Sequence, residues 1–418
     1  MDSDDFQDNV RKSIIAETGD IVRPTIVVQP LKNLTGDSEQ NYFVQGFTQE
    51  LIIELTRYED FQVIIAGDYS EESSRNRTPD MGRPERARFI ITGSMRKAET
   101  TFKIAIQLVD SASGEHIWGE QFRRNLTAAN LLIIQEEIVH EIITNIASEY
   151  GVIPRKLYHQ MRNKPEPDLH TFDAILRFYH YQNNLTPGTY LTAFNALEQA
   201  VARDAECGIA CAMLANLYLN AYALDLPNSD NSLVRAADLI QQAINTEPAN
   251  QLVRIISALL YFHLNRRAEF LNEMKKAEAL NPRSPLRIGS IGYFLALYGE
   301  WDRGKQLLDK AMKMNDNYPA WYHGVTTLYY YRKKEYEQAY TKATQYDLPD
   351  LFWTPLLRGA CLAQLQRSKE AGEQLNLLFE LKPDFQKKSR MLLQRFIKED
   401  SLVDHILDGL QKAESDIL

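Results

Sequence analysis

The sequence has few cysteines and no long hydrophobic run, and each shortage removes a class of protein. Only three of its 418 residues are cysteine, Cys207, Cys211 and Cys361, and an odd, sparse set is not a disulfide framework. No apolar stretch approaches the roughly 18 to 20 residues that a spanning helix needs, so we expect no membrane insertion. Residues 1–20 are rich in aspartate where a secretory signal would be basic and then apolar, which predicts a cytoplasmic protein.

Positive charge is also in short supply. The 47 Lys and Arg residues are outnumbered by 56 Asp and Glu residues, and the formal net charge is −9. Surfaces that neutralise nucleic-acid phosphates are basic, so we expect no general nucleic-acid binding. A hydrophobic content of 44% with 25% charged residues is typical of a globular protein. At roughly 150 residues per domain, the length predicts two or three domains.

Motifs that carry catalysis or hold metals are missing as well. The sequence has no Gly-x-x-x-x-Gly-Lys-Ser/Thr phosphate loop, His-Glu-x-x-His zinc helix or Gly-x-Ser-x-Gly elbow. Cys207 and Cys211 have no accompanying histidine or carboxylate cluster. Glu137 and His140 form a single Glu-x-x-His pair, where a di-iron bundle needs two. We therefore predict a protein that is not an enzyme and has no catalytic residues, metal or cofactor.

Residues 25–150 alternate between strand-like and helix-like patterns. Apolar residues recur about every four positions over 41–58 and 128–150, which predicts two amphipathic helices. The simplest packing is an α/β domain in which a mixed sheet is covered by these two helices. β-branched and aromatic runs predict the strands of that sheet at 25–29, 62–66, 88–95, 101–109 and 116–123.

From Asp168 onward the strand pattern ends, and Ala, Leu and Tyr recur with a period near 34 residues. Such a period is typical of a helical solenoid. Triplets such as Ala193, Leu197 and Ala200 predict pairs of antiparallel helices that approach closely through small side chains. The triplet recurs as Ala236, Ile240, Ala243; Phe270, Met274, Ala277; Gly304, Leu308, Ala311; and Ala371, Leu375, Leu378.

These units resemble the tetratricopeptide repeat, with about six copies in 168–383. The first half is similar to the TolB amino-terminal-like domain, through residues 25–37, 42–43, 91–94 and 113–118 together with Gly46. In bacteria that domain precedes tetratricopeptide repeats, often behind a class III nucleotide cyclase or winged-helix domain. The resemblance implies a bacterial protein whose relatives keep their chemistry in that leading domain, for which residues 1–24 are expected to be too short.

The predicted organisation follows from these patterns. An acidic N-terminal tail covers 1–24, and the TolB-like α/β domain covers 25–150. A linker at 151–167 leads into the all-α tetratricopeptide solenoid at 168–383. Residues 384–418 are expected to form capping helices that shield the last repeat, as an open solenoid requires.

The repeats supply the first candidate site. In this architecture the first helix of each pair lines a concave groove, and exposed aromatic residues beside polar ones are typical binding anchors. Residues 329–334 are basic and aromatic within an acidic protein, which predicts docking of an acidic peptide segment; a repeat helix with a solvated end is the alternative. The candidate partner-binding residues are Asn216, Asn220, Phe262, His263, Tyr293, Trp321, Tyr331, Arg332 and Trp353.

A second candidate is the loop 32–40, which leads from the first strand into a helix. Backbone amides at such a place can hold an anion, and Asn33, Thr35, Gly36 and Asp37 would line this ligand loop. The same residue types serve any strand-to-helix turn, and the Asp37 carboxylate would oppose an anion. Both interpretations remain open from the sequence.

The sequence thus predicts a non-enzymatic regulatory or assembly adaptor that binds a protein partner through the repeat groove. Self-association through the N-terminal domain is a further expectation. The alternative is the ligand-sensing half of a signalling system, in which the TolB-like domain binds a small ligand and works with a separate cyclase or transcription factor.

Overall fold

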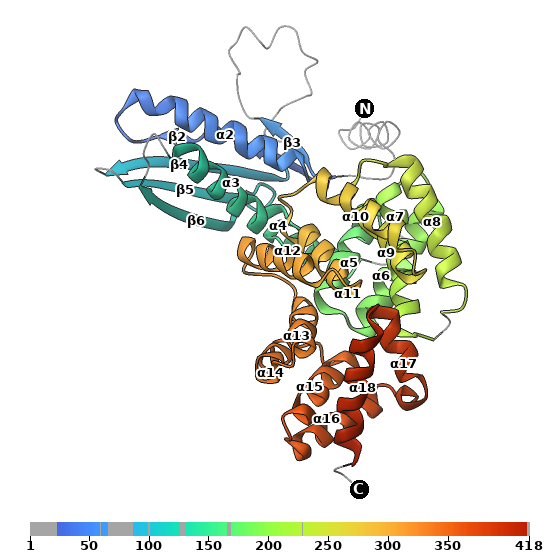
Figure 1. Ribbon diagram of the computed structural model, residues 1–418. Helices are drawn as coiled ribbons and strands as arrows, with labels where there is room; N and C mark the ends of the chain where they lie inside the picture. The colour runs from blue at the N-terminus through green and yellow to red at the C-terminus, as the bar shows by residue number, and fades with distance from the viewer. Residues whose placement is uncertain are drawn as a thin grey trace. The chain divides into compact units, whose positions relative to one another are not determined.

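The computed structural model describes residues 23–58, 60–65, 87–98, 101–125, 130–164, 169–227 and 229–415. The chain divides into two compact units, Met1–Gln160 and Met161–Leu418, called here the sheet unit and the repeat unit. Each is considered by itself (Figure 1). The acidic tail predicted at 1–24 lies almost wholly outside the described residues.

The sheet unit contains one mixed sheet, as predicted. The order is β3-β1-β4-β5-β6, and β2 also pairs with β4. Pairing is parallel between β1 and β3, β1 and β4, and β2 and β4, and antiparallel between β4, β5 and β6. The strands are β1 (Thr25–Val28), β2 (Lys32–Asn33), β3 (Gln62–Ile65), β4 (Phe89–Ala98), β5 (Thr101–Asp110) and β6 (Glu115–Asn125).

Helices α2 (Asn41–Thr56) and α3 (Leu131–Ala147) cover one face of this sheet and share its hydrophobic core. Both predicted helices are therefore present, each shorter than expected. Strand β5 alternates between side chains buried in that core, such as Phe102 and Ile104, and the more exposed Lys103 between them. The opposite face of the sheet therefore carries a separate set of side chains.

The repeat unit contains six helix–turn–helix pairs within its described residues (Figure 1). Helix α4 (Val152–Met161) precedes them, where a linker was expected. The pairs are α5 (Thr171–Asn184) with α6 (Pro187–Arg203), α7 (Gly208–Leu224) with α8 (Ser232–Thr246), α9 (Gln251–His263) with α10 (Arg267–Leu280), α11 (Pro285–Leu297) with α12 (Trp301–Met314), α13 (Tyr322–Arg332) with α14 (Tyr336–Gln345), and α15 (Trp353–Gln364) with α16 (Ser368–Leu381).

Small side chains let the paired helices approach closely. All three residues of the triplet Ala193, Leu197 and Ala200 are fully buried. The α11–α12 contact is the tightest case, because a Cβ on Gly304 would lie 2.5 Å from the backbone O of Gly292. The predicted spacing of small residues therefore has a direct structural reason.

The turn inside five of the pairs repeats one backbone motif. One residue with positive φ follows the first helix, and the next N–H donates to a carbonyl five residues back, as in Glu335 to Tyr330. This is the Schellman arrangement, which satisfies carbonyls at a helix end. The positive-φ residues are Asp225, Asn265, Gly299, Lys334 and Gln366.

The first helices of the pairs differ sharply from the second helices. Helices α7, α9, α11, α13 and α15 are buried along most of their length, and each contains at most one Lys, Arg, Asp or Glu. Helices such as α10 and α12 are rich in charge and keep one exposed side. The first helices therefore bury most of their side chains inside the repeat unit.

Two helices follow the pairs, α17 (Phe385–Phe396) and α18 (Asp400–Ser415). Helix α18 packs on α15 and α16, so it covers the last pair. Helix α17 instead contacts α7, far back in the chain. Within the described residues, no helix is long and apolar enough to cross a membrane.

Candidate functional site

The chain between the last pair and α18 returns across the ends of earlier helices; we call residues 382–399 the return segment. Three of its basic side chains converge on Asp225, at the C-terminal end of α7. Nζ of Lys382, Nζ of Lys388 and Nη1 of Arg395 lie 2.9, 2.8 and 3.1 Å from the Asp225 carboxylate. Burial opposes ionisation of Asp225, but hydrogen bonds from Lys388, Lys382 and Arg395 outweigh it and lower its pKa.

Further along, the return segment covers the end of α9. The Lys398 ammonium lies over the Phe262 ring, 4.6 Å from its centroid, and the Lys398 N–H donates to the carbonyl of Leu297 at 2.9 Å. Burial lowers the pKa of Lys398 to about 8. Burial and the nearby Lys398 lower the pKa of His263 to about 3, so this imidazole is neutral.

The last residue of the return segment, Glu399, contacts the fourth and fifth helix pairs. The Glu399 carboxylate accepts hydrogen bonds from Trp301 Nε1 at 2.6 Å and from Arg332 Nε at 2.8 Å. Burial raises the pKa of Glu399, but these donors outweigh it and the net shift is downward. Phe396 contacts Trp353 edge to face, with ring centroids 5.1 Å apart.

These contacts correct the predicted exposure of the groove residues. Five of the nine candidates are buried, and one, Arg332, is exposed but engaged with Glu399. Asn220, Tyr293 and Trp321 are half-buried. Neighbouring elements bury these side chains, and the return segment covers the ends of several first helices. The five buried residues are Asn216, Phe262, His263, Tyr331 and Trp353.

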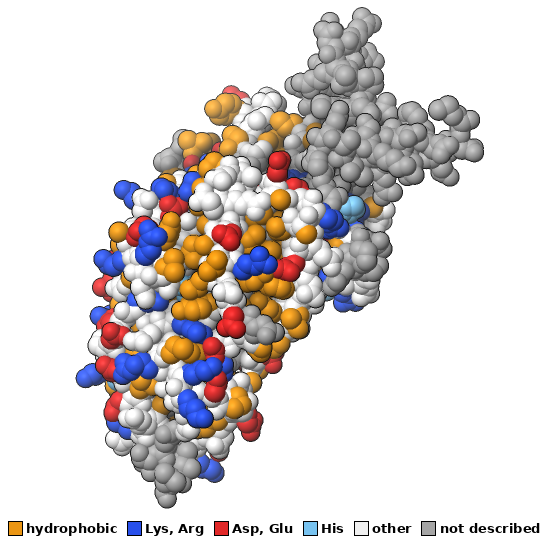
Figure 2. Space-filling model, turned by 90° about the vertical axis from the view of Figure 1, so that its right-hand side faces the viewer, with side chains coloured by type: hydrophobic (Ala, Val, Ile, Leu, Met, Phe, Trp, Pro, Cys, Tyr) orange, Lys and Arg blue, Asp and Glu red, His pale blue; other side chains and the backbone are white. Residues whose placement is uncertain are grey.

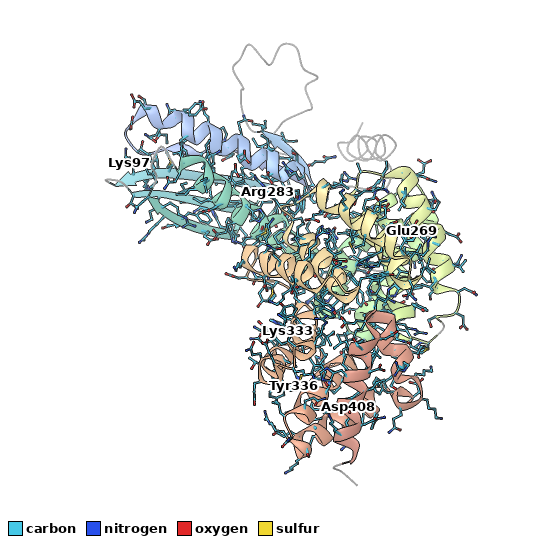
Figure 3. All side chains as sticks on the ribbon, in the orientation of Figure 1. Lys97, Glu269, Arg283, Lys333, Tyr336 and Asp408 are labelled. Atoms are coloured by element: carbon cyan, nitrogen blue, oxygen red, sulfur yellow. The ribbon has the colours of Figure 1, made fainter. Side chains whose placement is uncertain are left out.

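A concave site does exist beside the return segment. A cavity of about 720 Å³ lies between the end of α13, the start of α14, the end of α15, and α18. Figure 3 shows Tyr336 from α14 near Asp408 from α18, and both line this cavity. The lining residues are Arg332, Lys334, Tyr336, Gln364, Glu399, Ser401, Leu402, Asp404, His405, Asp408 and Lys412.

Hydrogen bonds fix the inner wall of this cavity. The Tyr336 hydroxyl and His405 Nε2 are 2.9 Å apart, and the Tyr331 hydroxyl donates to the His405 carbonyl at 3.1 Å. Burial and the nearby Lys334 lower the pKa of His405. Asp408 pairs with Lys412 at 2.6 Å. Lys334, by contrast, forms no ion pair with any described residue and is exposed.

The second predicted site is a closed network of hydrogen bonds. Nδ2 of Asn33 donates to the Asp37 carbonyl at 2.9 Å, and Oγ1 of Thr35 donates to Oδ1 of Asn33 at 2.7 Å. The Asp37 carboxylate accepts from the N–H of Glu39 at 3.0 Å, which lowers the Asp37 pKa. Gly36 has a φ of +77°. Asp37 itself occupies the amide that an anion would use, so the geometry favours the structural turn.

Cysteine and metal chemistry find no further support in the described part of the chain. No group of three His, Cys, Asp or Glu side chains there is placed to hold a metal ion. All three cysteines are buried. Burial raises the thiol pKa of Cys207 to about 12 and that of Cys211 to about 11, which disfavours the reactive thiolate.

Comparisons with known proteins show only distant likeness. No family model matches the sequence. A protein named putative adenylate cyclase 3, from Rhizobium meliloti (strain 1021), is 26% identical over 231 residues, covering 54% of this chain and 38% of that protein. This chain therefore spans well under half the length of that relative. The resemblance to the TolB amino-terminal-like domain stays a prediction.

Solved structures are more distant still. An IFIT1 monomeric mutant with Gppp-AAAA is 15% identical, covers 70% of this chain and 72% of its own, and has a TM-score of 0.44. The P58(IPK) TPR domain is 12% identical, covers 68% of this chain and 98% of its own, and has a TM-score of 0.20. The helical-repeat architecture therefore rests on the six pairs themselves.

Sequence reasoning missed the return segment and the cavity. It placed 384–418 as a cap on the last repeat, which describes α18 but not α17. The available signal was the run of Lys and Arg from Lys382 to Lys398 beside apolar residues such as Leu392 and Leu393, which predicts a partly buried basic helix. Its acceptor, Asp225, lies more than 150 residues away, and no local pattern connects the two.

Proposed function

We propose that the protein is a non-enzymatic adaptor that binds a peptide segment of a protein partner in the cavity between α13, α14, α15 and α18. The observation that supports this is the Lys334 ammonium, which forms no ion pair with a described residue and lies at the rim of a cavity of about 720 Å³. The cavity includes the end of the basic and aromatic stretch 329–334. We therefore still propose an acidic peptide as the ligand, but bound in this cavity rather than in the repeat groove.

The cavity suits a polar segment better than an apolar one. Leu402 is its one aliphatic lining residue, and the other side chains offer hydrogen bonds or charge. Asp408 and Glu399 already have cationic partners, so a carboxylate entering beside Lys334 meets one unsatisfied cation. Such complementarity favours specificity and fast association more than high affinity.

The test is recovery of partners from cells of the source organism by the tagged full chain. Lys334→Glu reverses the unpaired charge without touching the buried core, and we expect it to lose the bound partner. Lys387→Glu is the matched control, because Lys387 is an exposed lysine on α17 that does not line the cavity. If Lys334→Glu recovers the same partner as wild type, the cavity is not the binding site.

The name of the putative adenylate cyclase relative favours one second candidate, the sensing half of a signalling system. In that case a small ligand bound to the folded chain would stabilise it. A panel of nucleotides and small carboxylates, screened by thermal unfolding, should contain a compound that raises the melting temperature by several degrees. The side-chain donors of Asn33 and Thr35 are already used within their own loop. A screen without any shift would remove this candidate.

A further inference from the structure

The face of the sheet opposite α2 and α3 carries four cations in two neighbouring rows. Arg96, Lys103 and Arg123 are direct cross-strand partners on β4, β5 and β6. Lys32 on β2 is the register partner of Ser94, one row away on the same face. Arg96, Arg123 and Lys32 are exposed, and Lys103 is half-buried. We call these four residues the basic face.

No acid neutralises the basic face among the described residues. None of its four side chains forms an ion pair with a described residue. Like charges directly opposite each other on neighbouring strands destabilise a sheet. Three cations in one row therefore destabilise the sheet, and no acidic side chain among the described residues offsets this repulsion.

The neighbours of these cations behave differently. Arg124, next to Arg123 but on the opposite face, lies 3.6 Å from Glu141 of α3. Lys97, next to Arg96, lies over the Phe102 ring, 5.3 Å from its centroid; Figure 3 labels Lys97 at the end of β4. On the face shown in Figure 2, Lys and Arg side chains are interspersed with Asp and Glu. The unopposed row therefore differs from its direct neighbours Arg124 and Lys97.

We propose that the basic face binds an acidic segment of a partner protein. Adjacent strands are about 4.8 Å apart, so the row of three cations spans about 10 Å. Carboxylates two residues apart on an extended peptide are separated by about 6.6 Å, which places two of them over the row. The side chains between the cations, such as Ser94 and Gln121, add polar groups that can bond to a peptide backbone.

Nucleic acid fits this face less well. The rows Lys32–Ser94–Ala105–Gln121 and Arg96–Lys103–Arg123 contain no aromatic side chain on which a base can stack. The aromatic residues Trp118 and Phe122 of β6 pack against the core on the other face. The net charge of −9 also repels a long polyanion. A short acidic segment requires only the local field.

The experiment measures binding of a fluorescein-labelled octaglutamate peptide to the full chain by anisotropy. We expect saturable binding that weakens as salt rises from roughly 50 to roughly 300 mM, because exposed charges are screened. Lys103→Gln with Arg123→Gln should weaken the affinity about tenfold. Arg124→Gln is the matched control, since it removes an adjacent charge from the other face, and it should stay within about twofold of wild type.

Three outcomes would overturn the proposal. Wild-type protein that fails to bind the peptide at low salt would do so. Equal loss in Arg124→Gln would show that net charge, not the basic face, controls binding. An oligothymidylate of the same length that binds more tightly than the peptide, and loses that binding in the double variant, would assign the face to nucleic acid instead. Circular dichroism of each variant confirms that the sheet is intact.

Discussion

In the repeat unit the cations of the return segment that reach α7 meet the carboxylate of Asp225, whereas in the sheet unit the four cations of the basic face meet none among the described residues. The Asp225 contacts hold the return segment against the repeat unit, whereas the basic face leaves positive charge that a partner protein can neutralise. The comparison teaches that a cluster of basic residues predicts binding only when its acidic partner inside the fold is known.

The largest expected effect comes from breaking the closed arrangement. Asp225→Asn leaves Lys382, Lys388 and Arg395 without their shared carboxylate. The Asp225 side chain is only 14% exposed, so unpaired cations should lower the unfolding free energy by about 3 kcal/mol. Urea denaturation measures this change. Asp309→Asn removes a more exposed carboxylate, paired with Lys305, and should change stability by less than about 1 kcal/mol; equal losses would contradict the account.

Close helix packing in the repeat unit predicts the next effect. In Gly304→Ala the new Cβ would lie 2.5 Å from backbone atoms of Gly292 and Ala296, which cannot move like a side chain. We expect a loss of about 2 kcal/mol from overpacking. Gly188→Ala is the control, because a Cβ there has open space. A harmless Gly304→Ala would mean that α11 and α12 are further apart than described.

Acid should weaken the repeat unit through a buried histidine. The pKa of His263 is about 3 in the folded chain against an ordinary value of 6.5. Below pH 6.5 the unfolded chain binds a proton that the folded chain excludes, so stability decreases as the pH is lowered. We expect a loss of about 2 kcal/mol between pH 6.5 and about pH 5.

His263→Phe should reduce this slope but not abolish it, because burial also lowers the pKa of His323 to about 4. The same change at exposed His159 is the control. Asp225 does not contribute in that range, because its lowered pKa makes its stabilisation present above about pH 4 and lost below. An unchanged slope in His263→Phe would contradict the burial of this imidazole under the return segment.

A smaller effect concerns the turns. Gln366 has a φ of +60°, a conformation that costs a side-chain-bearing residue about 1 kcal/mol and glycine little. Gln366→Gly should therefore raise the thermal midpoint of the repeat unit, and Gly299, which already fills the equivalent turn, shows that glycine is compatible. A lower midpoint would argue against the shared Schellman turn.

The smallest effect tests the other side of the comparison. Lys103→Gln removes the middle charge of the row and relieves repulsion from Arg96 and Arg123, so the sheet unit should gain about 0.5 kcal/mol. Arg124→Gln should instead lose a little, because Arg124 pairs with Glu141. A loss of stability in Lys103→Gln would mean that the row serves the fold rather than a partner.

Local patterns made much of the fold predictable. β-Branched and aromatic runs predicted the strands of the mixed sheet, and apolar residues four apart, such as Phe43, Phe47, Leu51 and Leu55, predicted α2. The triplets of small residues predicted the helix pairs, because two helices that pack closely need small side chains at regularly spaced positions. Helix α4 was missed because its charged residues read as a linker.

The candidate sites were less predictable, since they depend on contacts between distant residues. Trp353 and Tyr331 are large aromatic residues of the type that anchors binding partners, but Phe396 and His405 from the C-terminal helices cover them. The basic face escaped notice because Lys32, Arg96, Lys103 and Arg123 are scattered in the sequence and are brought together by strand register. Arg332 and the neighbouring Lys334 belong to the predicted binding stretch 329–334 and also line the cavity.

The central claim is that the return segment closes the repeat unit. Amide hydrogen exchange of residues 385–396 in the full chain, followed by mass spectrometry, tests it most directly. The contacts of Asp225 with Lys382, Lys388 and Arg395 predict that α17 exchanges as slowly as α7, and that Asp225→Asn speeds α17 far more than α7. Rapid exchange of α17 in the wild-type chain, at the rate of an unprotected helix, would contradict the claim.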